Sequence, residues 1–201
     1  MKTQDIDPSL IQGNLFLIVG PSGSGKSTII EEILKSNPEL HFPVSATTRK
    51  PRPGEVPGED YYYLSIDEFK QKLDEGKFLE FAQVHGHSLY GTLFSEIIDP
   101  LRSGQSVIRH IDYQGAKSIR DLLPKENVHV IYINGGTWQQ LLTRINSRSE
   151  LSEAEIERRH QSFLVESQFI NEADLVVDNL DNELSIAVSK VNQYINLYLN
   201  S

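Results

Sequence analysis

The chain has 201 residues, 38% of them hydrophobic and 23% charged, which is the composition of a globular protein and not of a disordered one. Its formal net charge of −9 argues against a broad nucleic-acid-binding surface, so any nucleotide-sized anion must be bound by local clusters of cations and backbone N–H groups. The absence of cysteine excludes disulfides and thiolate metal sites, and no apolar run approaches the roughly 20 residues of a membrane span.

The chain opens with an acidic stretch and then enters a strand–loop–helix unit. Residues 1–13 lack the apolar segment of a secretory signal, so we expect a cytoplasmic protein without a membrane partner. The apolar run 14–20 predicts a buried strand, and 26–36 predicts a helix that ends before Pro38.

The loop between them, GPSGSGKST at 20–28, contains the G-x-x-x-x-G-K-[ST] pattern of a phosphate-binding loop. Its glycines let successive N–H groups converge on phosphate oxygens, and the helix that follows adds its positive end. Lys26 is expected to reach the β- and γ-phosphates of a nucleoside triphosphate, and the Ser27 hydroxyl to bind Mg²⁺. The predicted ATP-binding residues are Gly20, Ser22, Gly23, Ser24, Gly25, Lys26, Ser27 and Thr28.

The segment 46–94 differs from its surroundings because it is rich in Pro, Gly and Tyr. Strand-like pieces at 60–64 and 77–84 flank a helix that opens with a capping box, Ser65 to Glu68. Near its start Arg49 and Arg52 lie three residues apart. Paired guanidiniums suit a second phosphate site, but a solvated loop in which the basic residues pair with neighbouring acids fits the spacing equally well.

Three further apolar runs, 106–111, 127–133 and 174–179, alternate with helical patterns. This alternation predicts an α/β fold: a parallel-sheet core with helices on both faces. We expect a single domain with a core at about 10–45, 95–136 and 172–201, an inserted mixed α+β lobe at about 46–94 and a small helical lid at about 137–171.

Arg109 and His110 interrupt the run 106–111, where a strand covered on both faces should stay apolar. We interpret them as the carboxyl end of a strand that opens into a crevice, where polar side chains need no core.

The sequence also contains N-terminal signals for the remaining helices. Thr137 with Gln140 and Ser152 with Glu155 are the expected N-terminal signals. In the helix predicted at 152–171, Arg159 and Glu166 share a stripe with apolar residues, which points them inward. For the arginines of the predicted lid, Arg144, Arg148 and Arg159, the alternative is ordinary surface pairing with nearby glutamates. The last helix, 182–199, is predicted to pack a stripe on the core: Leu184, Val188, Val191, Ile195 and Leu199.

Several of these motifs together make the chain similar to the guanylate kinases over nearly its whole length: GPSGSGKST, VSATTRKPRPGEVPGEDYYY, FLEFAQV, LYGT, HIDYQG, and RINSR followed by IERRH. The resemblance implies transfer of the γ-phosphoryl group of MgATP to GMP or dGMP, in a parallel core with a GMP-binding lobe and a lid. The implied substrates are ATP and GMP, the implied cofactor is Mg²⁺, and either a monomer or a homodimer fits.

The resemblance also implies roles for single residues. Ser45 and Glu80 would bind the guanine base, and a carboxylate suits its two adjacent N–H donors. Asp112 would contact the nucleotide or Mg²⁺. The complete implied GMP site is Ser45, Arg49, Arg52, Tyr61, Glu80, Tyr90, Gly91, Thr92 and Asp112. The implied catalytic residues are Lys26, Arg49, Arg144, Arg148 and Arg159.

The chain departs from the family pattern at four places: His110 stands where an acid is usual, the loop HGHSLYGT is one residue longer, INGGT replaces a Pro-Pro-Ser segment, and Ser149 replaces a lid glycine. His85, His87 and His110 also raise the hypothesis of a zinc site. Two alternative functions remain open from the sequence, namely a P-loop kinase for another small phosphate acceptor and a non-catalytic binding module.

Overall fold

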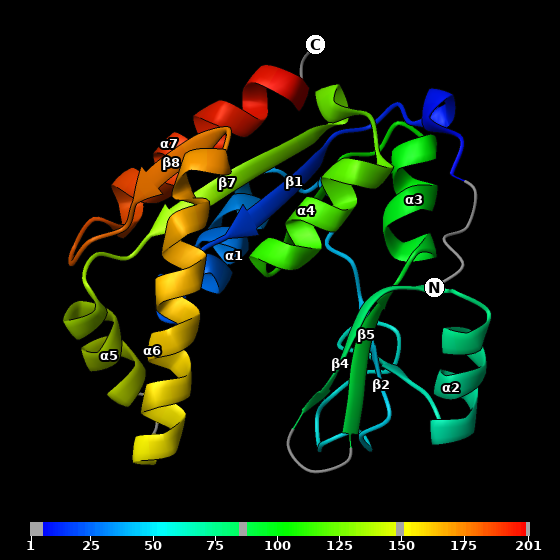
Figure 1. Cartoon of the computed structure of the whole chain (residues 1–201). Helices are drawn as coiled ribbons and strands as arrows, with labels where there is room; N and C mark the ends of the chain where they lie inside the picture. Colours follow the sequence, from blue (N-terminus) through cyan, green and yellow to red (C-terminus); the bar gives the residue numbers. More distant parts are fainter. Residues whose placement is uncertain (1–5, 85–87, 148–150, 200–201) are drawn as a thin grey trace.

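The computed structural model describes residues 6–84, 88–147 and 151–199 (Figure 1). Its centre is a parallel four-stranded sheet in the order β6-β1-β7-β8. These strands are the four apolar runs predicted from the sequence: β1 (Leu15–Val19), β6 (Val107–His110), β7 (Val128–Asn134) and β8 (Leu175–Asp178). The α/β class expected from the alternation of runs and helices is therefore confirmed.

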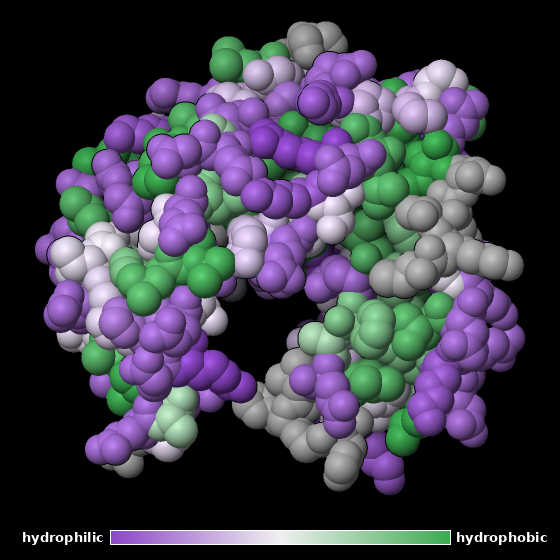
Figure 2. All heavy atoms as spheres, viewed as in Figure 1, coloured by the Kyte–Doolittle hydropathy of each residue, from purple (hydrophilic) through white to green (hydrophobic). Residues whose placement is uncertain are grey.

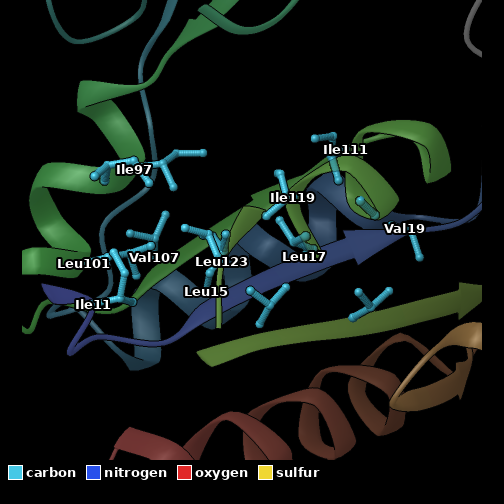
Figure 3. Packing of buried hydrophobic residues seen from close by; sticks show 14 of the residues in the cluster. Ile11, Leu15, Leu17, Val19, Ile97, Leu101, Val107, Ile111, Ile119 and Leu123 are labelled. Atoms are coloured by element: carbon cyan, nitrogen blue, oxygen red, sulfur yellow. The ribbon is translucent and has the colours of Figure 1, made fainter. Parts of the chain in front are cut away.

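Helices cover both faces of this sheet, because successive residues of a strand point to opposite sides and both sides of β1 are apolar. Leu15, Leu17 and Val19 pack toward α3 (Ser95–Arg102) and α4 (Tyr113–Leu122), as Figure 3 shows. Phe16 and Ile18 pack instead toward α1 (Lys26–Ser36) and α7 (Leu184–Leu199). The two resulting cores fix the carboxyl ends of the strands at one edge.

The stripe predicted on the last helix is only partly right. Val191 and Ile195 are buried as expected, but Leu184 is exposed, and Ala187 is buried in its place. Leu184 is the first residue of α7, so Ala187, one turn later, is the first side chain to reach the sheet.

The segment after β1 and α1 forms a second, mixed sheet in the order β3-β2-β5-β4. Its strands are β2 (Ser45–Thr47), β3 (Tyr62–Tyr63), β4 (Phe78–Val84) and β5 (Ser88–Leu93). Helix α2 (Ile66–Asp74) starts with the predicted capping box and stacks Phe69 on Phe78, with ring centroids 4.2 Å apart. We call this sheet with α2 the lobe.

Two helices, α5 (Trp138–Asn146) and α6 (Glu153–Gln168), form an arm on the other side of the core (Figure 1). Thr137 and Gln140 make the predicted capping box of α5, and the Ser152 hydroxyl caps α6. The helix predicted to run to 171 ends as α-helix at Gln168 and continues as a 3₁₀ turn, Phe169–Glu172. Two other 3₁₀ turns are Pro8–Leu10 and Lys125–Asn127.

The arm and the lobe face each other, and Figure 2 shows the surface hollowed between them. The carboxyl ends of the core strands lead into this hollow, where open parallel sheets bind their ligands. Among the described residues, no helix is long and apolar enough to cross a membrane.

Candidate nucleotide site

The phosphate loop joins β1 to α1 as the sequence predicts, and its shape depends on a residue from the end of β8. Gly25, which caps α1, has a φ of 91°, and a Cβ atom there would lie 2.3 Å from Nδ2 of Asn179. That buried amide donates a 2.8 Å hydrogen bond to the Ser24 carbonyl. Asn179 was missed by the sequence reasoning, although its place after a parallel strand, at the same edge as the loop, is the signal that could have found it.

Lys26 lies at the mouth of this loop. Its Nζ donates to the carbonyls of Gly20 at 2.5 Å and Pro21 at 2.9 Å. Burial lowers the pKa of Lys26, and the carboxylate of Glu166 acts in the opposite direction. The same burial raises the pKa of Glu166, on α6, while Lys26 lowers it. Glu166 is half-buried and lines one hollow together with Ser22 of the phosphate loop, in agreement with the inward position that its place on the apolar stripe predicts.

Arg159 connects the arm to the phosphate loop directly. Its Nη1 donates to the Ser22 hydroxyl at 3.0 Å, and its Nε donates to Glu155 at 2.9 Å. Arg159 therefore makes both contacts considered from the sequence: it pairs with a glutamate of its own helix and it points inward, to the phosphate loop. The hollow beside it measures about 430 Å³ and is lined by Ser22, Glu155, Arg158, Arg159, Ser162 and Glu166.

Arg144 forms its hydrogen bonds with groups that follow β8. Its Nη2 donates to Asp181 at 2.8 Å and its Nη1 to the Asn179 carbonyl at 2.9 Å. The third arginine expected in the lid, Arg148, lies outside the described residues.

Three residues of the predicted GMP site form one row across the lobe: Ser45 and Glu80, expected at the base, and Thr92, expected at the phosphate. Antiparallel pairing places Ser45 of β2 opposite Thr92 of β5, and Thr92 opposite Glu80 of β4. Directly opposed residues share a face of the sheet, so hydroxyl, hydroxyl and carboxylate lie side by side. Thr92 Oγ1 donates to Glu80 Oε1 at 2.8 Å. Gly91 points to the opposite face, where a Cβ atom would lie 2.7 Å from Phe78, so its position serves the packing of the lobe.

Arg49 is half-buried at the edge of this row. Its Nη1 and Nη2 donate to the two carboxylate oxygens of Glu55 at 2.9 and 2.8 Å, and its Nε donates to the Tyr90 hydroxyl at 3.2 Å. The guanidinium also lies 5.3 Å from the centre of the Tyr61 ring. Arg49 and other donors hold the pKa of Glu55 at about 2. The pairing of basic residues with neighbouring acids, one of the two interpretations of this loop, is therefore present at Arg49, which also contacts two tyrosines.

The neighbouring Arg52 is exposed, and its backbone N–H donates to Glu55 at 2.6 Å. The hydroxyls of Thr47 and Thr48 accept from the backbone N–H groups of Arg49 and Leu89, so they stabilise the loop.

At the end of β6 the expectation that polar residues need no burial is wrong for Arg109. This side chain is buried and donates from Nη2 to Glu80 Oε1 at 2.8 Å, so a carboxylate of the lobe takes the place of solvent. His110 points to the other side of the strand, toward Phe42, with ring centroids 6.2 Å apart. Burial lowers the pKa of His110, and the charges of Arg109 and Lys26 lower it further.

Comparison with known proteins agrees with this geometry. The family model for guanylate kinase matches residues 12–198. The chain is 40% identical over 174 residues to the guanylate kinase of Clostridioides difficile, which covers 87% of this chain and 83% of that one. It is 39% identical over 183 residues to the guanylate kinase of Thermotoga maritima, with coverage of 90% and 87%. The chain belongs to the guanylate kinase family.

A solved structure shows the same fold. The crystal structure of guanylate kinase from Anaplasma phagocytophilum has a TM-score of 0.68 to this chain and covers 93% of it, and 86% of that chain is matched. The sequences are 24% identical, so this likeness concerns the fold alone.

One departure from the guanylate kinase pattern has a packing explanation. Gly135 of the segment INGGT lies against the phosphate loop, and a Cβ atom there would be 2.8 Å from Cα of Ser24 and 2.5 Å from Leu141. Two other departures, in the loop around His85 and His87 and at Ser149, lie outside the described residues. The hypothesis of a zinc site needs His85 and His87, so it also concerns residues outside the described ranges.

The remaining polar groups suit the Mg²⁺ that a guanylate kinase uses with ATP. Ser27 lies in the first turn of α1, and Asp112 caps α4 by accepting from the Gly115 N–H at 2.7 Å. Asp112 and Glu166 line the same hollow of about 520 Å³ between α4 and α6. Among the described residues, no group of three His, Asp or Glu side chains could hold a metal alone. Hydroxyl and carboxylate oxygens with few protein ligands are what Mg²⁺ prefers when phosphates complete its shell.

Proposed function

We propose that the chain transfers the γ-phosphoryl group of MgATP to GMP, and also to dGMP, giving ADP and the nucleoside diphosphate in purine nucleotide metabolism. The observation that carries the proposal is the pair of phosphate-binding elements on either side of one hollow. The loop with Lys26 lies on the core, and Arg49 with its tyrosines lies on the lobe. A donor and an acceptor phosphate held this way can meet without a covalent intermediate.

The base of the acceptor binds at the row formed by Ser45, Thr92 and Glu80. A carboxylate accepts from two adjacent donors, and guanine presents such a pair at N1 and N2, whereas adenine does not. A site built to use those hydrogen bonds rejects a base that lacks them, because its buried polar groups would then be left unpaired.

The acceptor phosphate binds at Arg49, Arg52, Tyr61 and Tyr90. Both terminal nitrogens of Arg49 contact Glu55, and phosphate oxygens suit the same fork geometry, so a phosphate would share or displace that carboxylate. Glu55 also accepts from the Tyr63 hydroxyl at 2.7 Å, so it holds the loop and the guanidinium together.

Charge stabilisation during the transfer comes from Lys26 and from Arg144, Arg148 and Arg159 of the lid. Arg159 contacts Ser22 beside the phosphate loop, which supports its place near the transferring group. Ser27 and Asp112 would hold Mg²⁺, which would supply neutralisation of the charge on the phosphate oxygens of ATP. We assign the core to ATP, the lobe of about 46–94 to GMP, and the arm of about 137–171 to a lid that excludes water when it closes.

A substitution at Lys26 tests the proposal. Lys26→Met should lower ADP formation from MgATP and GMP by roughly a hundredfold or more, because the cation nearest the transferring phosphate is lost. The folded state should persist, as judged by circular dichroism. Lys35→Met is the matched control on the same helix, since Lys35 is exposed and pairs with Glu32, three residues earlier. Near-normal turnover of Lys26→Met would refute the role of the loop. Absence of ADP formation by the unaltered protein would favour a non-catalytic binding module.

A further inference from the structure

Arg109 is a buried cation in a strand of the core sheet, and its partner belongs to the lobe. It lies in β6, paired in register with Leu17 of β1, and its side chain is 10% exposed. A buried guanidinium is costly unless it is paired. The carboxylate of Glu80 on β4, 29 residues earlier in the chain, provides that pairing.

The contact places two donors from different parts of the molecule on one carboxylate oxygen. Oε1 of Glu80 accepts from Thr92 Oγ1 in the lobe and from Arg109 Nη2 in the core, each at 2.8 Å. Within the described part of the chain, Oε2 takes no hydrogen bond, and the Glu80 side chain is 37% exposed. One oxygen is therefore anchored from two directions, which fixes the plane of the carboxylate and leaves its other oxygen without a donor among the described residues.

The anchoring also joins the base-binding row to the core. Thr92 and Ser45 belong to the lobe, so without Arg109 the orientation of Glu80 relative to the ATP-binding core would depend on the lobe alone. Nε of Arg109 is buried and has no hydrogen-bond partner among the described residues, so Glu80 is the acceptor on which this guanidinium depends.

We propose that Arg109 is a positioning residue for guanine recognition, which holds the Glu80 carboxylate in the orientation that accepts the base. The inference rests on the proposed role of Glu80 in binding guanine. It predicts that Arg109 acts on the KM for the acceptor nucleotide and on base discrimination, and not on ATP binding or on the transfer itself.

The test uses steady-state kinetics with GMP and with IMP, which keeps O6 and N1–H but lacks the 2-amino group. Arg109→Leu suits it because replacing a buried charge by an apolar side chain of similar length is often tolerated by the fold. We expect the KM for GMP to rise roughly tenfold, as for a lost charge-assisted hydrogen bond. The preference for GMP over IMP should fall, with kcat and the KM for ATP nearly unchanged. Arg109→Lys, which keeps the charge, should restore part of the loss.

A double-mutant cycle separates this role from a general structural one. In a Glu80→Gln background, Arg109→Leu should add little, because the group that it positions is already altered. Arg120→Leu is the control, since Arg120 also forms an ion pair, with Asp174, at the amino end of the core strands away from the hollow.

Additive effects of the two substitutions, or equal changes in the KM for ATP and in kcat, would overturn the proposal. An unchanged KM for GMP in a well-folded Arg109→Leu protein would also overturn it. If Glu80→Gln itself left the KM for GMP and the base preference intact, the assignment of Glu80 would fail first, and the role of Arg109 with it.

Discussion

At the scale of single residues, the site consists of cations held by neighbouring acids and carbonyls at the positions where phosphates would bind. Lys26 contacts two carbonyls of its own loop, Arg49 a glutamate six residues away, and Arg159 a glutamate one turn earlier. Each arrangement orients the cation in advance, which reduces the ordering that a ligand must impose. In the proposed site, these acids therefore contribute by orienting the cations.

Glu55 shows this role through its pH dependence. Its pKa of about 2 in the folded protein is below the ordinary value of 4.5, so its contribution to stability is complete above pH 4.5 and is lost as the pH falls toward 2. Glu55→Gln should therefore have a lower melting temperature than the unaltered protein at pH 7, and the gap should narrow steadily below pH 4.5. Glu59→Gln, an exposed position in the same loop, is the control. A gap that does not vary with pH would contradict the role of the Arg49 pair.

His110 should make the chain's Mg²⁺ requirement differ from that of its relatives. An acid at this position, two residues before Asp112, could hold a water of the Mg²⁺ shell, whereas an imidazole offers no anionic oxygen. His110→Asp should lower, by several-fold, the Mg²⁺ concentration that gives half-maximal rate at fixed ATP. His110→Asn, which adds no charge, should leave it unchanged. Identical dependence of the rate on Mg²⁺ concentration in the Asp variant and the unaltered protein would contradict this prediction.

At the scale of elements, helix caps set where the helices of the arm begin. Helix α5 starts at a capping box in which Thr137 and Gln140 satisfy each other's backbone N–H groups. The helix then carries Arg144 toward Asp181, and Trp138 stacks on His160 of α6 with ring centroids 4.9 Å apart. The cap thus fixes the position of the whole arm.

Thr137→Ala should loosen this helix locally. Loss of a capping hydroxyl costs about 1 kcal/mol, so amide hydrogens of α5 should exchange roughly fivefold faster, while those of β1 keep their rates. Hydrogen exchange followed by mass spectrometry measures both in one experiment. Thr143→Ala is the matched control, because Thr143 is exposed in the middle of the same helix. Equal exchange in the two variants would show that the cap does not hold the helix.

The features that could be predicted from the sequence depend on neighbours close in the chain. The phosphate loop, the capping boxes and the four core strands follow from patterns spanning a few residues, and the structure contains all of them. The pairs Arg109–Glu80 and Arg144–Asp181 join residues 29 and 37 positions apart. No local pattern encodes such a pair, so Arg109 could be seen as an anomaly in its strand but its partner could not be named.

At the scale of the whole molecule, an acidic protein gathers cations at one hollow. The net charge is −9, yet each of the three parts around the hollow carries a cation of the predicted site: Lys26 in the core, Arg49 in the lobe and Arg159 in the arm. Two anionic nucleotides can therefore be bound by local charge in a chain that would repel polyanions elsewhere. Three separate segments of the chain supply these cations, so the fold is needed to assemble the site.

The most direct test of the account is the rate of ADP formation from MgATP with GMP, AMP, CMP and UMP as acceptors. The row of Ser45, Thr92 and Glu80 predicts that kcat/KM for GMP exceeds that for each of the others by about a thousandfold or more. Turnover of AMP, CMP or UMP as efficient as that of GMP would contradict the account.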